Sequence, residues 1–343
     1  MIKKFLNITK YLLLLGLAVW MMMLSFEGLE FSKFKEDLQH AEFSWILLSI
    51  FIGILAHIVR SLRWQLLLAP MEHHPNFWNT FHALLIGYFA NLAFPRMGEI
   101  TRCAILTKTD KIPVTESAGT VLVERTIDFL CLVGITLFVF MVELPKEHSF
   151  VTEVIYQAAV KLKNIFSNPL VLLISLVVVI AGISIIFYIL KKGKEGNSFF
   201  RKTTTMLKGF WKGISSIGKM KRKWTFLLYT FAIWFLYFLM TYVALFALPF
   251  IENLGLYKAL VVLVVGSVGM VIPVQGGIGA FHYFVKQTLV FYGISQEDGL
   301  VYATLLHGSQ MILVIVLGLI GLGVVFLRKT KSVSETNAKE PAS

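Results

Sequence analysis

Residues 91–102 read NLAFPRMGEITR and follow directly on the apolar run FHALLIGYFA at residues 81–90. One proline, one glycine and three charged side chains thus interrupt a segment of membrane-like composition. Proline lacks a backbone donor and glycine permits positive φ, so the chain is not expected to continue here as one straight helix. Backbone groups freed at membrane depth must be buried in protein or face water. The stretch therefore predicts a break inside a membrane domain, at a polar position.

The composition around this break is that of a membrane protein. Of the 343 residues, 57% are hydrophobic and only 15% are charged, and the mean hydropathy is +0.74. Soluble domains average about 25% charged residues. Several apolar runs are long enough to cross a hydrocarbon core of about 30 Å. No alternating strand pattern recurs, so we predict an all-α polytopic membrane protein rather than a barrel.

The formal net charge of +12 raises the alternative of a nucleic-acid partner. In a membrane protein an excess of lysine and arginine more often follows the positive-inside rule and attraction to anionic lipid. We therefore expect membrane lipids and no nucleic acid. The two cysteines, Cys103 and Cys131, lie in or beside apolar segments and suggest neither a disulfide framework nor a metal site.

Hydropathy divides the chain into full spans and broken segments. We predict about six full spans, near 10–26, 44–60, 117–142, 169–190, 224–248 and 300–327. Two further apolar regions, 77–107 and 258–293, are broken by proline and glycine. The first span resembles a signal peptide but lacks a small-residue cleavage site, so we expect it to remain. Residues 1–327 are then one transmembrane domain, and residues 328–343 a disordered cytoplasmic tail.

Charges in the loops predict the orientation. The loop 27–43 is acidic and is expected outside, whereas 191–223 holds eleven lysines or arginines against Glu195 and is expected in the cytoplasm. We also expect both termini in the cytoplasm. The sides assigned to the loops and termini are consistent with one another only if 77–107 and 258–293 are re-entrant helical hairpins. The halves 1–145 and 165–327 then form an inverted-topology repeat, which in transporters marks a site near the midplane. The alternative is a proline-kinked pair of spans joined by a flexible turn.

The turns of the two hairpins carry their own signal. Helices that begin after each break, near Met97 and Gly279, would aim free N–H groups at a cavity and favour an anion there. The predicted hinge and turn residues are Pro95, Gly98, Pro273, Gln275, Gly276, Gly277 and Gly279.

Charged residues gather at the first break and in the span that follows. Arg96, Glu99 and Arg102 are spaced three apart and share one helix face. Glu124, Arg125 and Asp128 lie inside the next apolar stretch. Charges at such a depth are costly unless they are paired or hydrated, so we expect pairing among these six residues. The group is either a substrate site or a buried network that only staples the hairpin to the next span.

Other polar residues leave two interpretations open. Arg60 and Arg63 could add positive charge at the cytoplasmic entrance, or they could snorkel at a helix end. His307 and Gln310 are three apart and fit a polar contact across helices better than a proton relay. The sequence holds no metal-ligand motif, no G-x-S-x-G and no Walker A. We therefore predict no catalytic residues, no metal and no cofactor.

Four segments in this order carry a family resemblance: RSLRWQLLLAP (60–70), GYFANLAFPRMGEITRCAIL (87–106), VLVERTIDFL (121–130) and IPVQGGIGAF (272–281). They resemble the lysylphosphatidylglycerol synthase transmembrane region, a flippase-like domain, over roughly residues 10–327. The resemblance implies an inner-membrane domain that moves a lipid between leaflets. It matches Asn91, Arg96, Glu99, Arg102, Glu124, Arg125 and Asp128 to one motif block and Pro273, Gly276, Gly277 and Gly279 to another. The chain ends sixteen residues after its last predicted span, so we expect a stand-alone member without the aminoacyl transferase domain.

These inferences lead to one principal hypothesis and two alternatives. The principal one is a flippase for an anionic or aminoacylated phospholipid, or for a polyprenyl-phosphate-linked lipid, that uses a charged cavity between the two hairpins. In the absence of an ATPase motif, transport is downhill or coupled to H+ or Na+. The alternatives are an intramembrane enzyme acting on a lipid phosphate, and a scaffold that recruits partners through the basic loop.

Overall fold

The regular structure is helical throughout the part of the chain that is described. The computed structural model describes residues 2–28, 30–145 and 220–337, with isolated positions between 150 and 184. Five helical segments in this part are long and apolar enough to cross a membrane, at 43–71, 114–143, 223–247, 252–271 and 296–327. A sixth is added if α1 (Ile2–Phe26) and α2 (Phe31–Gln39), which meet at a bend of 87°, form one span. The prediction of an all-α polytopic membrane protein is confirmed.

Five of the predicted full spans correspond to helices, namely α1, α3 (Phe43–Leu68), α6 (Val114–Glu143), α10 (Lys223–Val243) and α13 (Gln296–Asn337). The predicted span 169–190 and residues 191–219 of the basic loop lie outside the described residues. The expected disordered tail is corrected in part, because α13 continues to Asn337. Neither glycine nor proline occurs between residue 328 and Pro341, so nothing in the sequence breaks the helix earlier.

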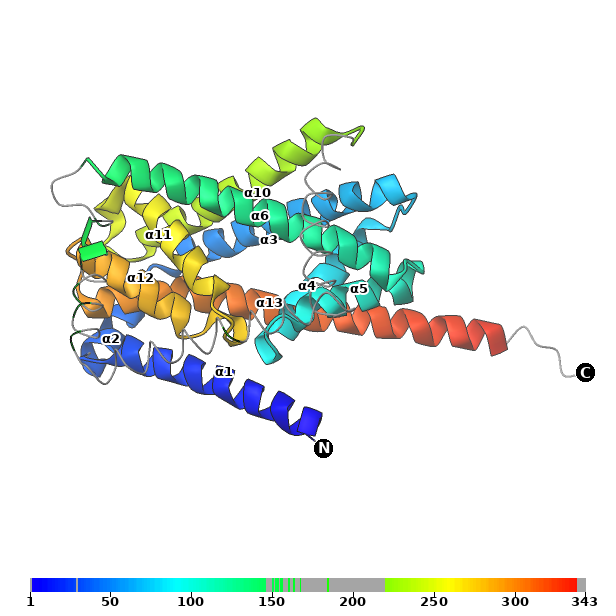
Figure 1. Ribbon diagram of the computed structural model, residues 1–343, viewed down its shortest axis with the longest axis horizontal. Helices are drawn as coiled ribbons and strands as arrows, with labels where there is room; N and C mark the ends of the chain where they lie inside the picture. Colours follow the sequence, from blue (N-terminus) through cyan, green and yellow to red (C-terminus); the bar gives the residue numbers. More distant parts are fainter. Residues whose placement is uncertain are drawn as a thin grey trace, which may run out of the picture. The chain divides into compact units, whose positions relative to one another are not determined.

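The chain divides into two compact units, residues 1–132 with 220–343, and residues 133–219. The candidate site and both helical hairpins belong to the first unit. Within it α3 packs along α10, and α13 packs on both α4 (Phe77–Ala93) and α12 (Ala280–Phe291) (Figure 1). The single 1–327 domain, its division into repeat halves and the re-entrant course of the hairpins remain predictions.

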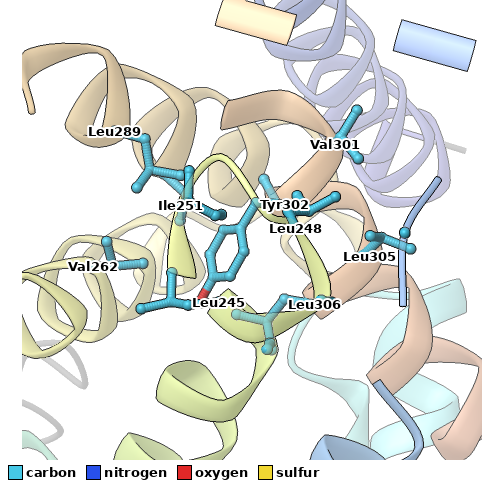
Figure 2. Packing of buried hydrophobic residues seen from close by; sticks show 14 of the residues in the cluster. Leu245, Leu248, Ile251, Val262, Leu289, Val301, Tyr302, Leu305 and Leu306 are labelled. Carbon is cyan, nitrogen blue, oxygen red and sulfur yellow. The ribbon is translucent and has the colours of Figure 1, made fainter. Parts of the chain in front are cut away.

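A hydrophobic core holds the second half of this unit together. Tyr302 of α13 is fully buried among leucines, isoleucines and valines of α11 (Gly255–Val271), α12 and the turn after α10 (Figure 2). Its hydroxyl donates to the carbonyl oxygen of Thr241 over 2.6 Å. A buried tyrosine needs such an acceptor, because an unpaired hydroxyl in apolar surroundings is unfavourable. The core therefore sets the position of α13 against α10.

The first hairpin consists of α4 and α5 (Met97–Asp110), which fold back on each other around Pro95. Arg96, between the two helices, adopts a left-handed φ of 66°. The backbones approach closely at Gly87 and Gly98. The Asn91 side chain closes the turn, because its Oδ1 accepts from the Gly98 N–H over 2.7 Å. This bond satisfies one of the free N–H groups that we expected, from the sequence, to bind an anion.

The second hairpin consists of α11 and α12, joined by residues 272–279. Three glycines in the turn, Gly276, Gly277 and Gly279, all have positive φ, which explains the glycine-rich sequence. Nε2 of His307 lies 2.9 Å from the carbonyl oxygen of Gly276. A Cβ on Gly276 would meet the side chain of Leu92, so the tips of the two hairpins touch. The predicted turn residues thus lie at two adjoining breaks.

The close approach in the first hairpin generates a stability prediction. In Gly98→Ala the new Cβ would overlap the Gly87 carbonyl oxygen and lie 2.7 Å from the Asn91 amide nitrogen. The helices must separate, and we expect a loss of about 1–3 kcal/mol in unfolding free energy, as for other overpacked sites. Chemical unfolding of the purified protein in detergent measures the loss. The matched control is Gly119→Ala in α6, where nothing lies within 4 Å of the new Cβ. Equal stabilities for the two variants would contradict the assigned packing.

Candidate functional site

The centre of the site is the carboxylate of Glu124, which is 0% exposed. It lies in α6 and accepts hydrogen bonds from three arginines of two other helices. Nη2 of Arg60 and Nη2 of Arg63, both in α3, donate to Oε1, the latter over 3.4 Å. Nη1 of Arg102 in α5 donates to Oε2 over 2.9 Å. One side chain therefore ties α3, α5 and α6 together.

Asp128 lies one turn after Glu124 and binds the same pair of α3 arginines. Arg60 donates to its Oδ2 over 2.9 Å and Arg63 to its Oδ1 over 2.7 Å. The spacing of three in α3 and of four in α6 places each pair on one helix face. The two faces meet, so two carboxylates and two guanidinium groups form a closed quartet.

Neutral polar side chains satisfy further donors of the arginines. Nη1 of Arg60 donates to the hydroxyl of Tyr237 over 2.9 Å, and Nη1 of Arg63 donates to Oγ1 of Thr230 over 3.3 Å. Both partners lie in α10, seven residues apart on one face. Sequence reasoning missed them, although polar residues at this spacing in an apolar helix are a detectable signal.

A tryptophan supports the third arginine. The Arg102 guanidinium lies over the ring of Trp64, 4.6 Å from its centroid, and the Trp64 Nε1–H donates to Oγ1 of Thr120 over 2.8 Å. Such a cation–π contact strengthens when it is removed from water. Trp64 is fully buried, so it is a part of the site rather than a residue of the membrane-surface aromatic belt.

The buried cluster carries an excess of positive charge. Arg60, Arg63 and Arg102 are at most 5% exposed, and among the described residues their ion-pair partners are the carboxylates of Glu124 and Asp128. One of the three positive charges thus has no negative counterpart inside the cluster. Nε and Nη2 of Arg102 are buried and have no hydrogen-bond partner. Nε of Arg60 and Nε of Arg63 are likewise buried without a partner, but of these three arginines it is Arg102 that lines the crevice described below.

A second ion pair lies beside the cluster and is more exposed. Nη2 of Arg125 in α6 is 2.9 Å from Oε1 of Glu99 in α5, and the two side chains are 44% and 28% exposed. Oε2 of Glu99 is buried without a hydrogen-bond partner. An exposed pair contributes only about 0–1 kcal/mol, so it opens far more easily than the Glu124 contacts.

The residues that carry these unpaired donors and this acceptor line one crevice between α4, α5 and α6. Its lining comprises Leu84, Gly87, Tyr88, Asn91, Gly98, Glu99, Arg102 and Arg125. The crevice has no room for a water molecule in this conformation. The arrangement can therefore receive an anionic group with its own hydrogen-bond donors only after the Arg125–Glu99 pair between α5 and α6 opens and the crevice widens.

Several sequence-based expectations about these residues need correction. The snorkelling alternative for Arg60 and Arg63 is wrong, because both are buried inside the protein and ion-paired. The expected pairing of Arg96 is also wrong within the described residues, since this side chain is exposed at the turn and makes no ion pair there. Its left-handed backbone directs it away from the face shared by Glu99 and Arg102.

The second hairpin stands apart from the charged crevice. None of its residues lines the crevice or joins the ion pairs in the described part of the chain. His307 contacts the hairpin turn, whereas Gln310 donates to the carbonyl oxygen of Ser49 over 3.4 Å. These two side chains make separate contacts across helices, as the sequence favoured. Among the described residues, no three metal-ligating side chains come together.

The sequence is similar to known proteins. Residues 7–318 match the family described as "Lysylphosphatidylglycerol synthase TM region". A protein named "UPF0104 membrane protein MJ1595", from Methanocaldococcus jannaschii, is 29% identical over 136 residues. The match covers 39% of this chain and 40% of that protein, so the chain spans well under half the length of this curated relative. No solved structure matches the chain.

The central carboxylate generates a stability prediction. Glu124→Gln removes the negative charge while keeping the size of the side chain, and leaves three buried arginines around one remaining carboxylate. Breaking a buried pair in this way costs about 3–5 kcal/mol, because uncompensated charge stays buried. Chemical unfolding in detergent measures the change. The control is Glu116→Gln, whose side chain is 44% exposed and contacts only His73, and for which we expect less than about 1 kcal/mol. An equally small effect for Glu124→Gln would contradict the burial of the cluster.

Proposed function

The chain belongs to the lysylphosphatidylglycerol synthase transmembrane region family, and we propose that it moves a lipid between the leaflets of the cytoplasmic membrane. The headgroup enters the crevice of α4, α5 and α6 while the acyl or polyprenyl chains stay in the bilayer. The proposed orientation has both termini in the cytoplasm. The proposed activity is transport without chemical conversion of the lipid.

The observation that carries this proposal is the unmatched positive charge of the cluster. Buried donors without partners are unfavourable, and Arg102, which lines the crevice, has two of them. A phosphate oxygen is a suitable acceptor, because arginine binds phosphate through paired, charge-assisted hydrogen bonds. The excess of one positive charge matches a headgroup with a single negative charge, such as a phosphodiester.

The free acceptor in the same crevice adds a second requirement for the headgroup. Oε2 of Glu99 is buried and unpaired, so it favours a ligand that brings a hydroxyl or ammonium donor close to its phosphate. Phosphatidylglycerol and aminoacylated phospholipids carry such donors on a group beside the phosphate, whereas a fully ionised polyprenyl phosphate has none. We therefore rank the phospholipids above the polyprenyl phosphate.

The difference in exposure between the two ion pairs supports a mechanism for opening. The Arg125–Glu99 pair is part-exposed and bridges α5 and α6, whereas the Glu124 contacts are buried. A headgroup phosphate competes with Glu99 for Arg125, and its donor then binds Glu99. The Glu124 cluster keeps α3, α5 and α6 assembled while this exchange takes place. Transport is downhill or driven by an H+ or Na+ gradient.

The decisive experiment is a leaflet-exchange assay in proteoliposomes with the full-length protein. Fluorescent phosphatidylglycerol, an aminoacylated phospholipid and a polyprenyl phosphate are compared for wild type and Arg125→Gln. We expect exchange of at least one phospholipid, and a decrease of about 10- to 100-fold in Arg125→Gln, since a hydrogen bond to a charged group contributes about 1.5–3 kcal/mol. Because the pair is exposed, this variant should remain folded.

The matched control is Lys258→Gln, which also removes one positive charge but lies in α11, over the ring of Tyr292. Its exchange rate should equal that of wild type. Equal rates for Arg125→Gln and wild type would refute the crevice as the headgroup site. If no lipid exchanges with or without an H+ or Na+ gradient, transport itself is refuted. Conversion of a radiolabelled lipid by the pure protein would then favour an intramembrane enzyme.

A further inference from the structure

A cavity lies between α1 and the turn that joins α11 to α12, and its volume is about 450 Å³. Its α1 side is formed by six apolar residues between Leu15 and Phe26, which recur at the spacing of one helix face. The turn contributes Gln275 and Ile278. Small-molecule sites usually have volumes of about 300–1,000 Å³. This space, which we call the α1 cavity, is therefore large enough for a ligand.

Contacts between α1 and the second hairpin hold the walls of the α1 cavity in place. Gly279 lets the turn approach the backbone of α1, because a Cβ there would lie 2.6 Å from the Ala18 carbonyl oxygen. Oγ of Ser25 donates to the carbonyl oxygen of Gly279 over 3.3 Å. Nζ of Lys286 in α12, a residue that is 1% exposed, donates to the carbonyl oxygen of Ser25 over 3.0 Å. The cavity is thus a part of the folded structure and does not need a ligand to form.

One lining residue of the α1 cavity is polar. Among the described residues that line it, Gln275 is the single member with a polar side chain, and its Oε1 is buried without a hydrogen-bond partner. A buried acceptor without a donor is unfavourable. Water alone is a poor occupant, because a buried water needs two to four polar partners and the lining offers one polar side chain. The lining therefore favours a mainly apolar ligand that carries one donor.

The α1 cavity can be reached from outside the protein. Three of its lining residues, Leu15, Val19 and Met23, are 49%, 52% and 67% exposed. Helix α1 is the predicted first span, so these residues face the hydrocarbon of the bilayer. Methionine is flexible and adapts to ligands of different shape, which suits a wall that a lipid chain must pass.

We propose that the α1 cavity binds the hydrocarbon chain of a membrane lipid that carries a hydroxyl group at its polar end, and that this hydroxyl donates to Oε1 of Gln275. A charged donor such as an ammonium group is disfavoured, because the lining has no opposite charge to compensate for its burial. A neutral hydroxyl satisfies the acceptor without that cost. The cavity is separate from the headgroup crevice, and its occupancy does not depend on transport.

The α1 cavity and the crevice are nevertheless neighbours through the tips of the two hairpins. Gln275 lines the cavity, and the next residue, Gly276, meets the side chain of Leu92 in α4. Asn91, which precedes Leu92, lines the crevice. A chain bound in the cavity therefore contacts the turn that abuts the first hairpin.

Photolabelling of the full-length protein in phosphatidylcholine nanodiscs tests the site, because the headgroup of this lipid has no hydrogen-bond donor. The probes are a long-chain alcohol with a diazirine in its chain and the methyl ether of the same alcohol. Mass spectrometry of the peptides locates the label. We expect the alcohol to label residues 15–26 and 275–278 about 2- to 10-fold more strongly than the ether, the effect of one hydrogen bond.

Two substitutions on α1 form a matched pair that tests binding of the chain. Leu15→Trp places a larger side chain in the cavity wall and should remove most of the label. Leu13→Trp is the control, because Leu13 is 69% exposed on the same helix and does not line the cavity, and it should label as wild type does. If Leu15→Trp fails to fold, Val19→Trp takes its place, since Val19 is an exposed lining residue.

Gln275→Leu tests the hydrogen bond, because it removes the acceptor while keeping a side chain of similar size. This variant should bind the alcohol and the ether equally. Three results would overturn the proposal. They are equal labelling of wild type by the two probes, a label that is not concentrated at residues 15–26 and 275–278, and wild-type labelling of the folded tryptophan variant in the cavity wall.

Discussion

The contact on which the described structure depends is the carboxylate of Glu124 with its three arginines. Arg60 and Arg63 come from α3, and Arg102 comes from α5. A buried ion cluster is not in general more stable than an apolar core of the same volume, because removing the charges from water is costly. Its effect is directional, since a misplaced helix would leave a buried charge unpaired. The cluster therefore sets which faces of α3, α5 and α6 meet, and through the same arginines it also positions α10.

The two hairpins depend on a different constraint, the absence of side chains at close backbone contacts. Gly87 and Gly98 allow α4 to approach α5, and Gly276 allows the turn of the second hairpin to meet Leu92. Hydrogen bonds then hold each turn, from the Gly98 N–H to Asn91 in one, and between His307 and the Gly276 carbonyl in the other. Because the tips touch, a movement of one hairpin must displace the other.

Helix α13 links the two hairpins, because it packs on α4 of the first and on α12 of the second. Asp298 lies at its start, and His307 follows nine residues later, about 13 Å along the helix at 1.5 Å per residue. The helix packs on α2, and its middle contacts the turn of the second hairpin through His307. The crevice with its unmatched arginine lies on the other hairpin. Because α13 packs on α4, which lines the crevice, and on α12 of the second hairpin, it joins the two hairpins.

The sequence by itself determined the membrane class, the all-helical fold and the positions of both breaks, because hydropathy, proline and glycine act locally along the chain. It also singled out Glu99, Arg102, Glu124, Arg125 and Asp128 as charges too deep to be unpaired. Only the tertiary structure decided how they pair. Arg60 and Arg63 could be taken for a helix end until α3 was packed on α6, and Arg96 left the group because its backbone is left-handed. Pairing is decided by which helix faces meet, and this depends on contacts between residues far apart in the chain.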